Sequence, residues 1–487
     1  MATPRPKRSA IQEAKRHLIL SAGPGLIALG LIANGADDAS SASLLSCGLL
    51  LVLLFVLGGA SAERIVHVLQ RNRIASVAAL VFCIWTAFTA LRFESNNAPQ
   101  AFSALFHPAW ADLLAGAYGA ISISPYRTLE GLASLLGAIA AFAIGASIVI
   151  ERSDRARVGR LLCVFAAGFS LYALIQYFGV QDGHARLHVN FSSANSAAAL
   201  FGIFCLLHIA MIYEGMESRK RRPLDAGDAL STGLALSQTL FAVIGLALAL
   251  CGLMLTGSRA GLVVTLLAIA TMVTLIAVRR PFNPTRLKVL GVILLILAPL
   301  ALGGLRFALD RGLFDDAARR ALILDAHWDA FLARPFIGHG MNSFHALNLL
   351  YSDAEHWRGL YNLGAAHNIY LQTLEETGLV GLAALALMLA GPLWRALRNA
   401  LSNRPSRIWA SAAFAGFMLA LIHGLVDFTL QTPAIAALLC FMLGLANAPN
   451  PFKPKPAPVR AASSAPFQGL ASSKIAIATS RNAHAQL

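Results

Sequence analysis

Apolar residues in this chain gather in blocks that are separated by short polar segments. A helix of about 20 apolar residues crosses the roughly 30 Å hydrocarbon layer of a membrane. The pattern therefore predicts an all-α polytopic membrane protein with about twelve transmembrane helices. The predicted spans cover residues 18–35, 43–61, 74–92, 129–150, 160–180, 195–213, 232–256, 262–278, 287–306, 369–391, 408–427 and 433–448.

The ends of the chain differ in composition from the apolar blocks. A basic segment over 1–17 precedes the first block, whose apolar stretch is longer than the roughly 7–15 residues of a signal peptide. No small-residue cleavage site ends that stretch cleanly, so we expect it to remain as a span. The expected organisation is a transmembrane domain over 18–448 and a disordered Pro-, Ala- and Ser-rich tail over 449–487.

Positive charge marks one side of the predicted bundle. The chain is 57% hydrophobic and 13% charged, against roughly 25% charged residues in soluble domains. Its formal charge of +15 lies in short clusters between the blocks, whereas a nucleic-acid-binding protein would gather it on one soluble face. Loops rich in Lys and Arg face the cytoplasm, so we expect both termini there. If each block spans once, one side holds 29 of the 39 basic residues, within 1–17, 62–73, 151–160, 214–231, 279–288, 392–407 and 450–487.

The sequence offers no pattern for a metal or a disulfide framework. All six cysteines fall inside apolar blocks and none forms a CxxC pair. The histidines of the long outer loop are irregularly spaced, and neither an HExxH pattern nor an Asp-rich motif occurs. We therefore expect no metal and no other cofactor.

Two long segments lie on the opposite, outer side. One runs from about 93 to 128, and the other joins spans nine and ten over about 307–366. Loops of that length are usually functional. The second contains an amphipathic stretch that predicts a helix lying on the membrane interface. Its apolar stripe is formed by Ala321, Leu324, Trp328, Phe331 and Leu332.

Four polar motifs from distant parts of the chain fall on this outer side. Arg186 and Asn195 precede span six, and the turn between spans seven and eight is very short. The remaining residues lie where the long loop enters span ten and where span eleven turns into span twelve. The motif residues are Arg186, Asn195, Ser258, Arg259, His367, Asn368, Gln372, Glu376, His423 and Asp427.

The positions of these side chains permit both chemical and structural roles. A guanidinium at Arg259 sits at or below the membrane surface, where it needs a partner. It could reach phospholipid headgroups, or it could grip a phosphate-bearing ligand with its planar donors, and Arg186 has the same alternatives. His367 could accept a proton or serve as a plain hydrogen-bonding residue. Glu375 and Glu376 could be functional or could pack helices. His423 and Asp427, four residues apart, favour an ion pair between helix ends.

In this order, the motifs resemble the O-antigen ligase and Wzy-type polysaccharide polymerase superfamily over roughly residues 160–445. The most specific part begins at His367 and Asn368 and runs on to Glu376. The outer loop also looks like the family's loop signature. The stretches that carry the resemblance are WDAFLARPFIGHGMNSF, HNIYLQTLEETGL, SRAG and LVDFTLQTPA.

The resemblance implies a bacterial inner-membrane glycosyltransferase of the GT-C type with its active site on the periplasmic side. The donor would be a glycan on undecaprenyl diphosphate. A ligase would move it to a lipid A core sugar in lipopolysaccharide biosynthesis, and a polymerase would move it to another lipid-linked repeat unit. His367 would then be the catalytic base, with Arg259, Arg186 and Ser258 binding the diphosphate of the donor.

The other motif residues would support that site as polar neighbours, and inversion at the anomeric carbon without a metal would be expected. Protein O-glycosylation is a variant of the same reaction. Two other classes fit the spans as well: a glycolipid transporter and a non-catalytic assembly protein of the cell envelope. A transporter usually shows an internal repeat, and we see no strong one.

Overall fold

The computed structural model describes most of the chain up to residue 449. Its described residues are 10–58, 62–94, 97, 103–112, 117–149, 152–180, 186–220, 229–278, 313–352, 357–360, 363–402, 404 and 406–449. The predicted span at 287–306 and the tail from 450 onward lie outside them.

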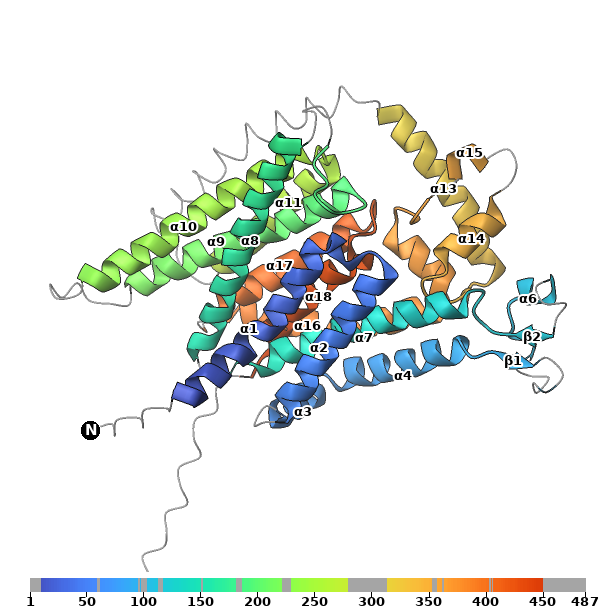
Figure 1. The fold of residues 1–487 in the computed structure, drawn as a ribbon, viewed down its shortest axis with the longest axis horizontal. Coiled ribbons are helices and arrows are strands. Elements are labelled where there is room, and N and C mark those ends of the chain that lie inside the picture. The colour runs from blue at the N-terminus through green and yellow to red at the C-terminus, as the bar shows by residue number, and fades with distance from the viewer. Residues whose placement is uncertain are drawn as a thin grey trace, which may run out of the picture. The chain divides into compact units, whose positions relative to one another are not determined.

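Nearly all the described secondary structure is helical (Figure 1). A single pair of two-residue strands, β1 (Phe93–Glu94) and β2 (Tyr118–Gly119), runs antiparallel within the first outer segment. The helices are α1 (Ala10–Ile32), η1 (Asn34–Ala36), α2 (Ala39–Leu57), α3 (Ala62–Arg71), α4 (Arg73–Thr89), α6 (Ala109–Asp112), α7 (Pro125–Ser147), α8 (Arg152–Val180), α9 (Ala194–Lys220), α10 (Ala229–Leu255), α11 (Arg259–Ala277), α13 (Leu313–Ala333), α14 (Phe344–Tyr351), α15 (Trp357–Leu360), α16 (Ile369–Ala400), α17 (Arg407–His423), η3 (Thr429–Gln431) and α18 (Pro433–Asn447).

The helices confirm an all-α polytopic membrane protein. Among the described residues, seven are long and apolar enough to cross a membrane, or eight if the bent pair α3 and α4 counts as one span. Three more apolar helices are shorter: Arg16–Ile32 within α1, together with α17 and α18. Helices cover most of each predicted block that the structure describes, and 287–306 lies outside the described residues, so the number twelve stays a prediction.

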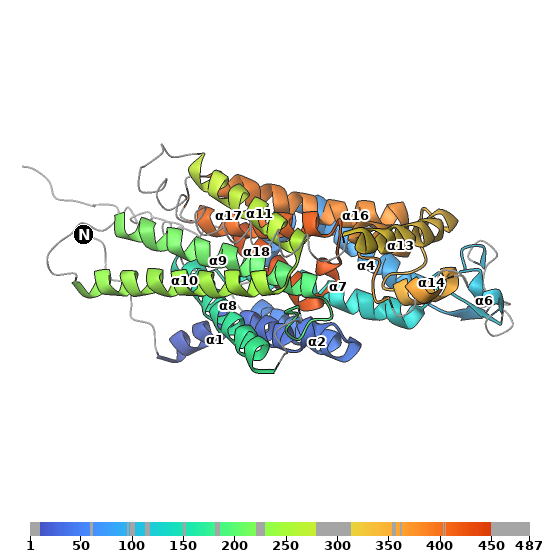
Figure 2. The same ribbon diagram turned by 90° about the horizontal axis from the view of Figure 1, so that it is seen from above.

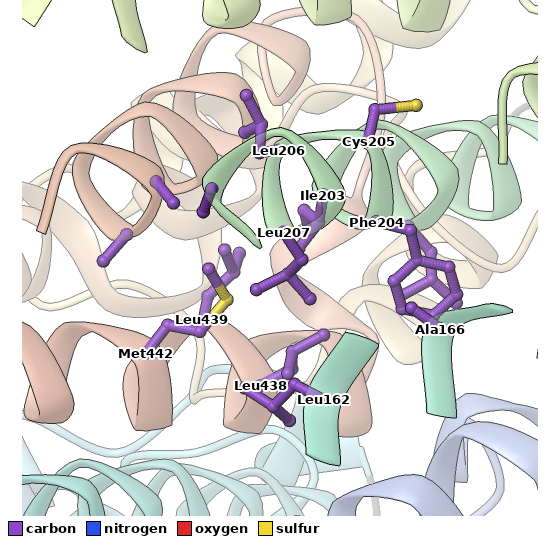
Figure 3. Close-up of a cluster of buried hydrophobic side chains, with 14 of the residues drawn as sticks. Leu162, Ala166, Ile203, Phe204, Cys205, Leu206, Leu207, Leu438, Leu439 and Met442 are labelled. Carbon is purple, nitrogen blue, oxygen red and sulfur yellow. The ribbon is translucent and has the colours of Figure 1, made fainter. Parts of the chain in front are cut away.

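Helix α9 forms the centre of the bundle. It packs along α10 and also contacts α17, α11 and α8, and α9 and α10 run side by side in both views (Figure 1, Figure 2). The apolar window of α9 is completely buried. Figure 3 shows its side chains Ile203 and Leu207 beside Leu438 of α18 and Leu162 of α8. A helix that is apolar on every side belongs in such a core.

The elements of the two outer segments gather at one end of the long helices. Helices α13, α14 and α15 lie at the same end as α6 and the strands in both views (Figure 1, Figure 2). Helix α13 covers the stretch predicted to be an amphipathic helix. The residues of the predicted apolar stripe differ in burial. Phe331 is buried in the protein, whereas Leu324, Trp328 and Leu332 are about half exposed. Leu324, Trp328 and Leu332 form an apolar stripe that is narrower than the predicted one. The prediction of an interfacial helix rests on these three side chains.

Two boundaries differ from the sequence predictions in ways that matter below. Span eleven was expected to run to residue 427, but α17 ends at His423. The segment 62–73 was expected to be a loop, but it holds α3, which meets α4 at a bend of 98°. Apolar periodicity did not show either feature, because a chain reversal depends on what the turn packs against.

Candidate functional site

The backbone at His367 is set by the start of α16. Asn368 is the N-cap residue, and its side-chain oxygen accepts hydrogen bonds from the amides of Tyr370 and Leu371 at 3.0 and 3.1 Å. This is the standard satisfaction of free amides at a helix start. His367 precedes the cap in a left-handed conformation, φ +52°, which is uncommon for a residue with a side chain. The cap therefore holds the imidazole in one direction.

The imidazole of His367 lies close to a buried carboxylate. Nδ1 of His367 lies 3.6 Å from Oδ1 of Asp427, whose side chain is fully buried while that of His367 is 31% exposed. The imidazole also meets the ring of Phe428 edge-on, with centroids 5.3 Å apart. The histidine thus has one ring nitrogen facing a carboxylate and the other available to the exterior.

Two further side chains, Thr429 and His423, continue the contact between His367 and Asp427. These four side chains form a polar row. The hydroxyl of Thr429 donates to Oδ2 of Asp427 at 3.3 Å, and Nδ1 of His423 lies 2.9 Å from the same hydroxyl oxygen. Nδ1 of His423 lies 3.9 Å from Oδ2 of Asp427. Because the hydroxyl of Thr429 contacts both atoms, Thr429 bridges the predicted ion pair. The predicted contact between His423 and Asp427 is therefore present at the end of α17, although the helix ends at His423 and Asp427 lies in the turn beyond it.

Two atoms of this row have no hydrogen-bond partner within the described residues. They are Oδ1 of Asp427, which faces His367, and Nε2 of His423, and both are buried. Buried polar atoms are normally satisfied, and an orphaned one calls for an explanation. Here the orphaned oxygen lies beside the one exposed imidazole of the row, where a modest ring movement would give it a partner.

The turn that carries Asp427 is tied directly to the start of α16. The amide of Ile369 donates to the carbonyl of Gly424 at 2.8 Å, and the hydroxyl of Tyr370 donates to the carbonyl of Leu421 at 2.8 Å. A Cβ on Gly424 would lie 2.6 Å from Cγ2 of Ile369. The glycine therefore permits the close approach that brings Asp427 to His367.

The arginine motif at 186 is also fixed by hydrogen bonds. Nε of Arg186 donates to the carbonyl of Thr256 at 2.8 Å, and its Nη2 donates to Oδ1 of Asn195 at 3.1 Å. The amide of Leu187 donates to the carbonyl of Leu255 at 2.9 Å. The structure thus brings Arg186 and Asn195 together and docks both onto the turn before Arg259.

That turn is as short as the sequence predicted. Ser258 is the N-cap of α11, and its hydroxyl oxygen accepts from the amide of Gly261 at 3.1 Å. A Cβ on Gly261 would lie 2.5 Å from Cβ of Ala198, so α11 starts in close contact with α9. Arg259, half-buried, is the first residue of α11. The proposed diphosphate-binding roles of Ser258 and Arg259 stay predictions.

The short helix η3 lies between the helices that carry these motifs. This short helix, which begins at Thr429, contacts α9, α16, α17 and α18. Asn195 lies in the first turn of α9. His367 directly precedes α16, so the two helices next to these motifs, α9 and α16, both contact η3.

Deeper in α16, the helix breaks at Gly378, which has φ +67° and ψ −175°. The loop at 335–340 satisfies the backbone groups that the break frees. The amides of His339 and Gly340 donate to the carbonyls of Glu375 and Glu376 at 3.0 and 2.8 Å. The amides of residues 379 and 380 donate to the carbonyls of 335 and 336 at 2.8 and 3.3 Å. The two motifs PFIGHG and LEETGLVG are therefore held together by backbone hydrogen bonds. We call this hydrogen-bonded pair of segments the joint.

Glu376 extends this joint toward His367. Its carboxylate accepts from the amides of Asn342 and Phe344 at 2.8 and 3.2 Å and from Nε2 of Gln372 at 3.0 Å. Oε1 of Gln372 in turn accepts from the amide of Ala366, the residue before His367, at 3.1 Å. These two predicted site residues thus act on the histidine through the backbone, and neither touches its ring.

Glu375, which could be functional or could pack helices, forms a contact between helices. Its Oε2 lies 2.6 Å from Nδ1 of His327, and both side chains are buried. Nε2 of His327 lies 3.3 Å from Oδ1 of Asn348, whose amide donates to the carbonyl of Leu360. The pair therefore fastens α13, α14 and α15 to α16. Sequence reasoning found no role for His327, since its partner is 48 positions away.

A contact between His107 and His339 joins the two long segments that the sequence places on the outer side. Nδ1 of His107 accepts from the amide of Ala109, so Nε2 of His107 donates to Nδ1 of His339 at 2.7 Å, and Nε2 of His339 donates to the carbonyl of Ala330. Burial, with the charge of Arg334 nearby, lowers the pKa of His107 to about 3. Burial likewise lowers the pKa of His339 to about 4. Both imidazoles are therefore neutral at pH 7.

The His, Cys, Asp and Glu side chains of the part of the chain that the structure describes bear on metal ligation. Within it, no group of three or more His, Cys, Asp or Glu side chains lies close enough to hold a metal ion. The polar row of His367, Asp427, Thr429 and His423 instead has the arrangement of an imidazole positioned by a carboxylate. Such an arrangement can take a proton from a hydroxyl.

Comparison with known proteins identifies one family model that matches part of this chain. Residues 244–386 match the family model of the O-antigen ligase domain, which confirms the resemblance to the O-antigen ligase and Wzy-type superfamily. The match includes the turn with Arg259, the long outer loop and the start of α16 with His367. A search of the curated proteins finds no match.

Proposed function

We propose that this multi-pass protein is an inverting glycosyltransferase of the GT-C type in the bacterial inner membrane. It transfers a glycan from an undecaprenyl-diphosphate donor to a sugar hydroxyl of the lipid A core, which makes it an O-antigen ligase. The O-antigen ligase domain at 244–386 supports the reaction class. The observation that carries the proposal is the exposed imidazole of His367 beside the buried, unpartnered Oδ1 of Asp427.

His367 acts as the general base in this reaction. With Nδ1 toward Asp427, Nε2 is the nitrogen that takes the proton from the acceptor hydroxyl as its oxygen attacks the anomeric carbon. Asp427 orients the ring and stabilises the imidazolium that forms. The 3.6 Å separation is longer than a hydrogen bond, and catalytic hydrogen bonds often tighten only when substrate binds.

Arg259 and Arg186 act on the leaving group. As the bond between the anomeric carbon and the diphosphate oxygen breaks, negative charge develops on the diphosphate. Fixed cations in a site shielded from water stabilise such charge strongly. Arg186 is already oriented by Thr256 and Asn195, so it needs little reorganisation. Attack from the face opposite the diphosphate inverts the anomeric centre.

Substrate placement follows from the ends of the helices. The polyprenyl chain lies among the spans, and the glycan extends over the outer elements α13 to α15. The exposed stripe of Leu324, Trp328 and Leu332 suits the membrane interface, where an acceptor glycolipid is anchored. The long outer segment favours a ligase, whose acceptor is a large core oligosaccharide. A polymerase with the same donor chemistry is the alternative.

Two experiments test the proposal. Purified protein is given undecaprenyl-diphosphate glycan and lipid A core acceptor, and product is followed by mass spectrometry. Glycosidic bond formation is expected, and its absence with every acceptor would contradict an enzyme. In a deletion strain, lipopolysaccharide gels separate the alternatives: free lipid-linked polymer with bare core means ligase, whereas single repeat units mean polymerase.

Variants separate the enzyme from a transporter or an assembly protein. Loss of product with His367→Ala, at unchanged protein level in the membrane, is expected only for the enzyme. A chain that complements the deletion strain with both His367→Ala and Arg259→Ala would be a non-catalytic assembly protein. A cysteine at position 364, which lies in open space three residues before His367, should react with an impermeant thiol reagent from the periplasm. Labelling only from the cytoplasm would overturn the expected topology.

A further inference from the structure

A second polar feature lies at the other end of α16, at the corner where α3 meets α4. Helix α3 contacts α7, and the guanidinium of Arg64 donates to the carbonyl of Val149 just beyond the end of α7. One face of α3 is buried through Ile65 and Val68, whereas Val66 and Leu69 are about half exposed. A short amphipathic helix at 98° to the following span has the geometry of a membrane-interface segment.

Asn72 connects this corner to α16. It is buried between α3 and α4, and its Nδ2 donates to the carbonyl of Val68 at 3.0 Å. Its Oδ1 accepts from Nε of Arg395 at 2.8 Å. Because the Nε donor is used, the two terminal nitrogens of Arg395 keep four donors in a fixed plane. The asparagine thereby holds the guanidinium at the surface of the corner.

Two more arginines surround that guanidinium. Arg71 ends α3 and Arg398 follows Arg395 by one helical turn, and both are exposed and repel it electrostatically. In the part of the chain that the structure describes, no carboxylate forms an ion pair with any of the three. Three like charges held this close call for an anion, since clustering them in isolation is unfavourable.

The surroundings indicate which anion. Trp394, 60% exposed, precedes Arg395 on α16, and Leu69 and Ile74 are exposed on either side of Asn72 in the sequence. Tryptophan concentrates at the level of lipid headgroups. Basic pockets between spans on the cytoplasmic side bind the headgroups of anionic lipids. The distribution of Lys and Arg along the sequence predicts that this corner faces the cytoplasm.

We propose that Arg71, Arg395 and Arg398 bind the phosphate of an anionic phospholipid in the cytoplasmic leaflet, with the apolar side chains of α3 and Trp394 resting on its acyl chains. The site lies at the end of α16 opposite His367, and it is independent of the proposed glycosyl transfer. It would anchor the carboxyl-terminal end of the helix whose other end carries the candidate base.

Lipid titration of the purified protein tests this site. Native mass spectrometry counts bound phosphatidylglycerol and phosphatidylcholine as each is added. The wild-type chain is expected to bind one phosphatidylglycerol in preference. Arg398→Gln should weaken that binding about fivefold, and Arg71→Gln with Arg398→Gln about 30-fold, since one surface cation near a membrane is worth roughly 1 kcal/mol.

Arg127→Gln is the matched control, because it removes the same charge from an exposed arginine at the opposite end of α7, where Arg127 pairs with Glu130. Its phosphatidylglycerol binding should stay at the wild-type level. Equal binding by the wild-type and the double variant would overturn the proposal. So would displacement of the lipid by inorganic phosphate at equal affinity, which would indicate a free-phosphate site.

Asn72→Asp keeps the test decisive if the double variant fails to fold. The new carboxylate has nearly the same shape, retains the bond to Arg395 and competes with the lipid phosphate for the three arginines. Loss of the preferred phosphatidylglycerol in a chain with wild-type thermal stability supports the site. Retention of that lipid would contradict it.

Discussion

Two polar groups lie along the first half of α16, and they differ in how completely their atoms are satisfied. Around Glu376, both carboxylate oxygens accept hydrogen bonds, and Gln372 passes the connection on to Ala366. Around His367, the facing oxygen of Asp427 has no partner within the described residues, and the imidazole is partly exposed. A satisfied buried network makes a structure rigid, whereas an unsatisfied one is a candidate for chemistry.

The difference also separates two polar motifs within one stretch of sequence. HN and EETG are only eight residues apart, yet the first presents a side chain to the exterior and the second closes a backbone joint. Substitutions of His367 should therefore change turnover at constant stability. Substitutions at the second should change stability first, and turnover only as a consequence.

Removal of the imidazole should give the largest effect. His367→Ala deletes the proposed general base, and such a base contributes roughly 10²–10⁴-fold to a rate. Turnover of undecaprenyl-diphosphate glycan should fall by about that factor, while the unfolding temperature in detergent stays unchanged. His345→Ala, on the exposed side of α14, is the control. A stability loss in His367→Ala that matches its activity loss would erase the distinction between the two groups.

The arginine at the start of α11 comes next. Arg259→Lys keeps the charge but loses the planar pair of donors. One charge-assisted hydrogen bond is worth about 1.5–3 kcal/mol, so turnover should fall about 10- to 100-fold. Steady-state kinetics with the lipid donor measure this fall, with Arg127→Lys as the control. Wild-type turnover in Arg259→Lys would contradict the proposed binding of the donor diphosphate by the planar donors of Arg259.

The joint itself is tested by Gly378→Ala. A side chain at φ +67° and ψ −175° is strained, and its Cβ would lie 2.2 Å from the carbonyl oxygen of Phe336. Strain of this kind costs about 1–3 kcal/mol, so the unfolding temperature should drop. Gly364→Ala provides the control, because nothing lies within 4 Å of its Cβ. Equal unfolding temperatures for the two variants would show that the break is not a rigid joint.

The smallest effect should come from acid on the contact between His107 and His339. Their pKa values in the fold, about 3 and about 4, lie below the ordinary value of 6.5, so the opened state binds more protons. The contact is therefore stable above pH 6.5 and weakens progressively as pH falls toward 3. Hydrogen exchange at 105–122 should accelerate from pH 7 to pH 5 more than exchange in α9. A uniform change would contradict this local opening.

The sequence by itself determined the parts of the protein that depend on local composition. Blocks of apolar residues predicted the helical spans, and the Gly-Ser-Arg turn predicted the short connection into α11. The apolar block predicted at 369–391 began where α16 begins, and the structure shows Asn368 as its cap. These features arise within a few neighbouring residues, so periodicity and turn chemistry suffice to predict them.

Only the tertiary structure decided which side chains meet. The early end of α17 brings Asp427 to His367, and the break at Gly378 pairs with a loop some 40 positions earlier. Glu375 takes His327 as its partner, a residue 48 positions earlier in the chain. Each contact depends on packing between segments that are distant in sequence. Hydrophobic periodicity carries no information about such pairs, and their physical origin is the need to satisfy polar groups buried between helices.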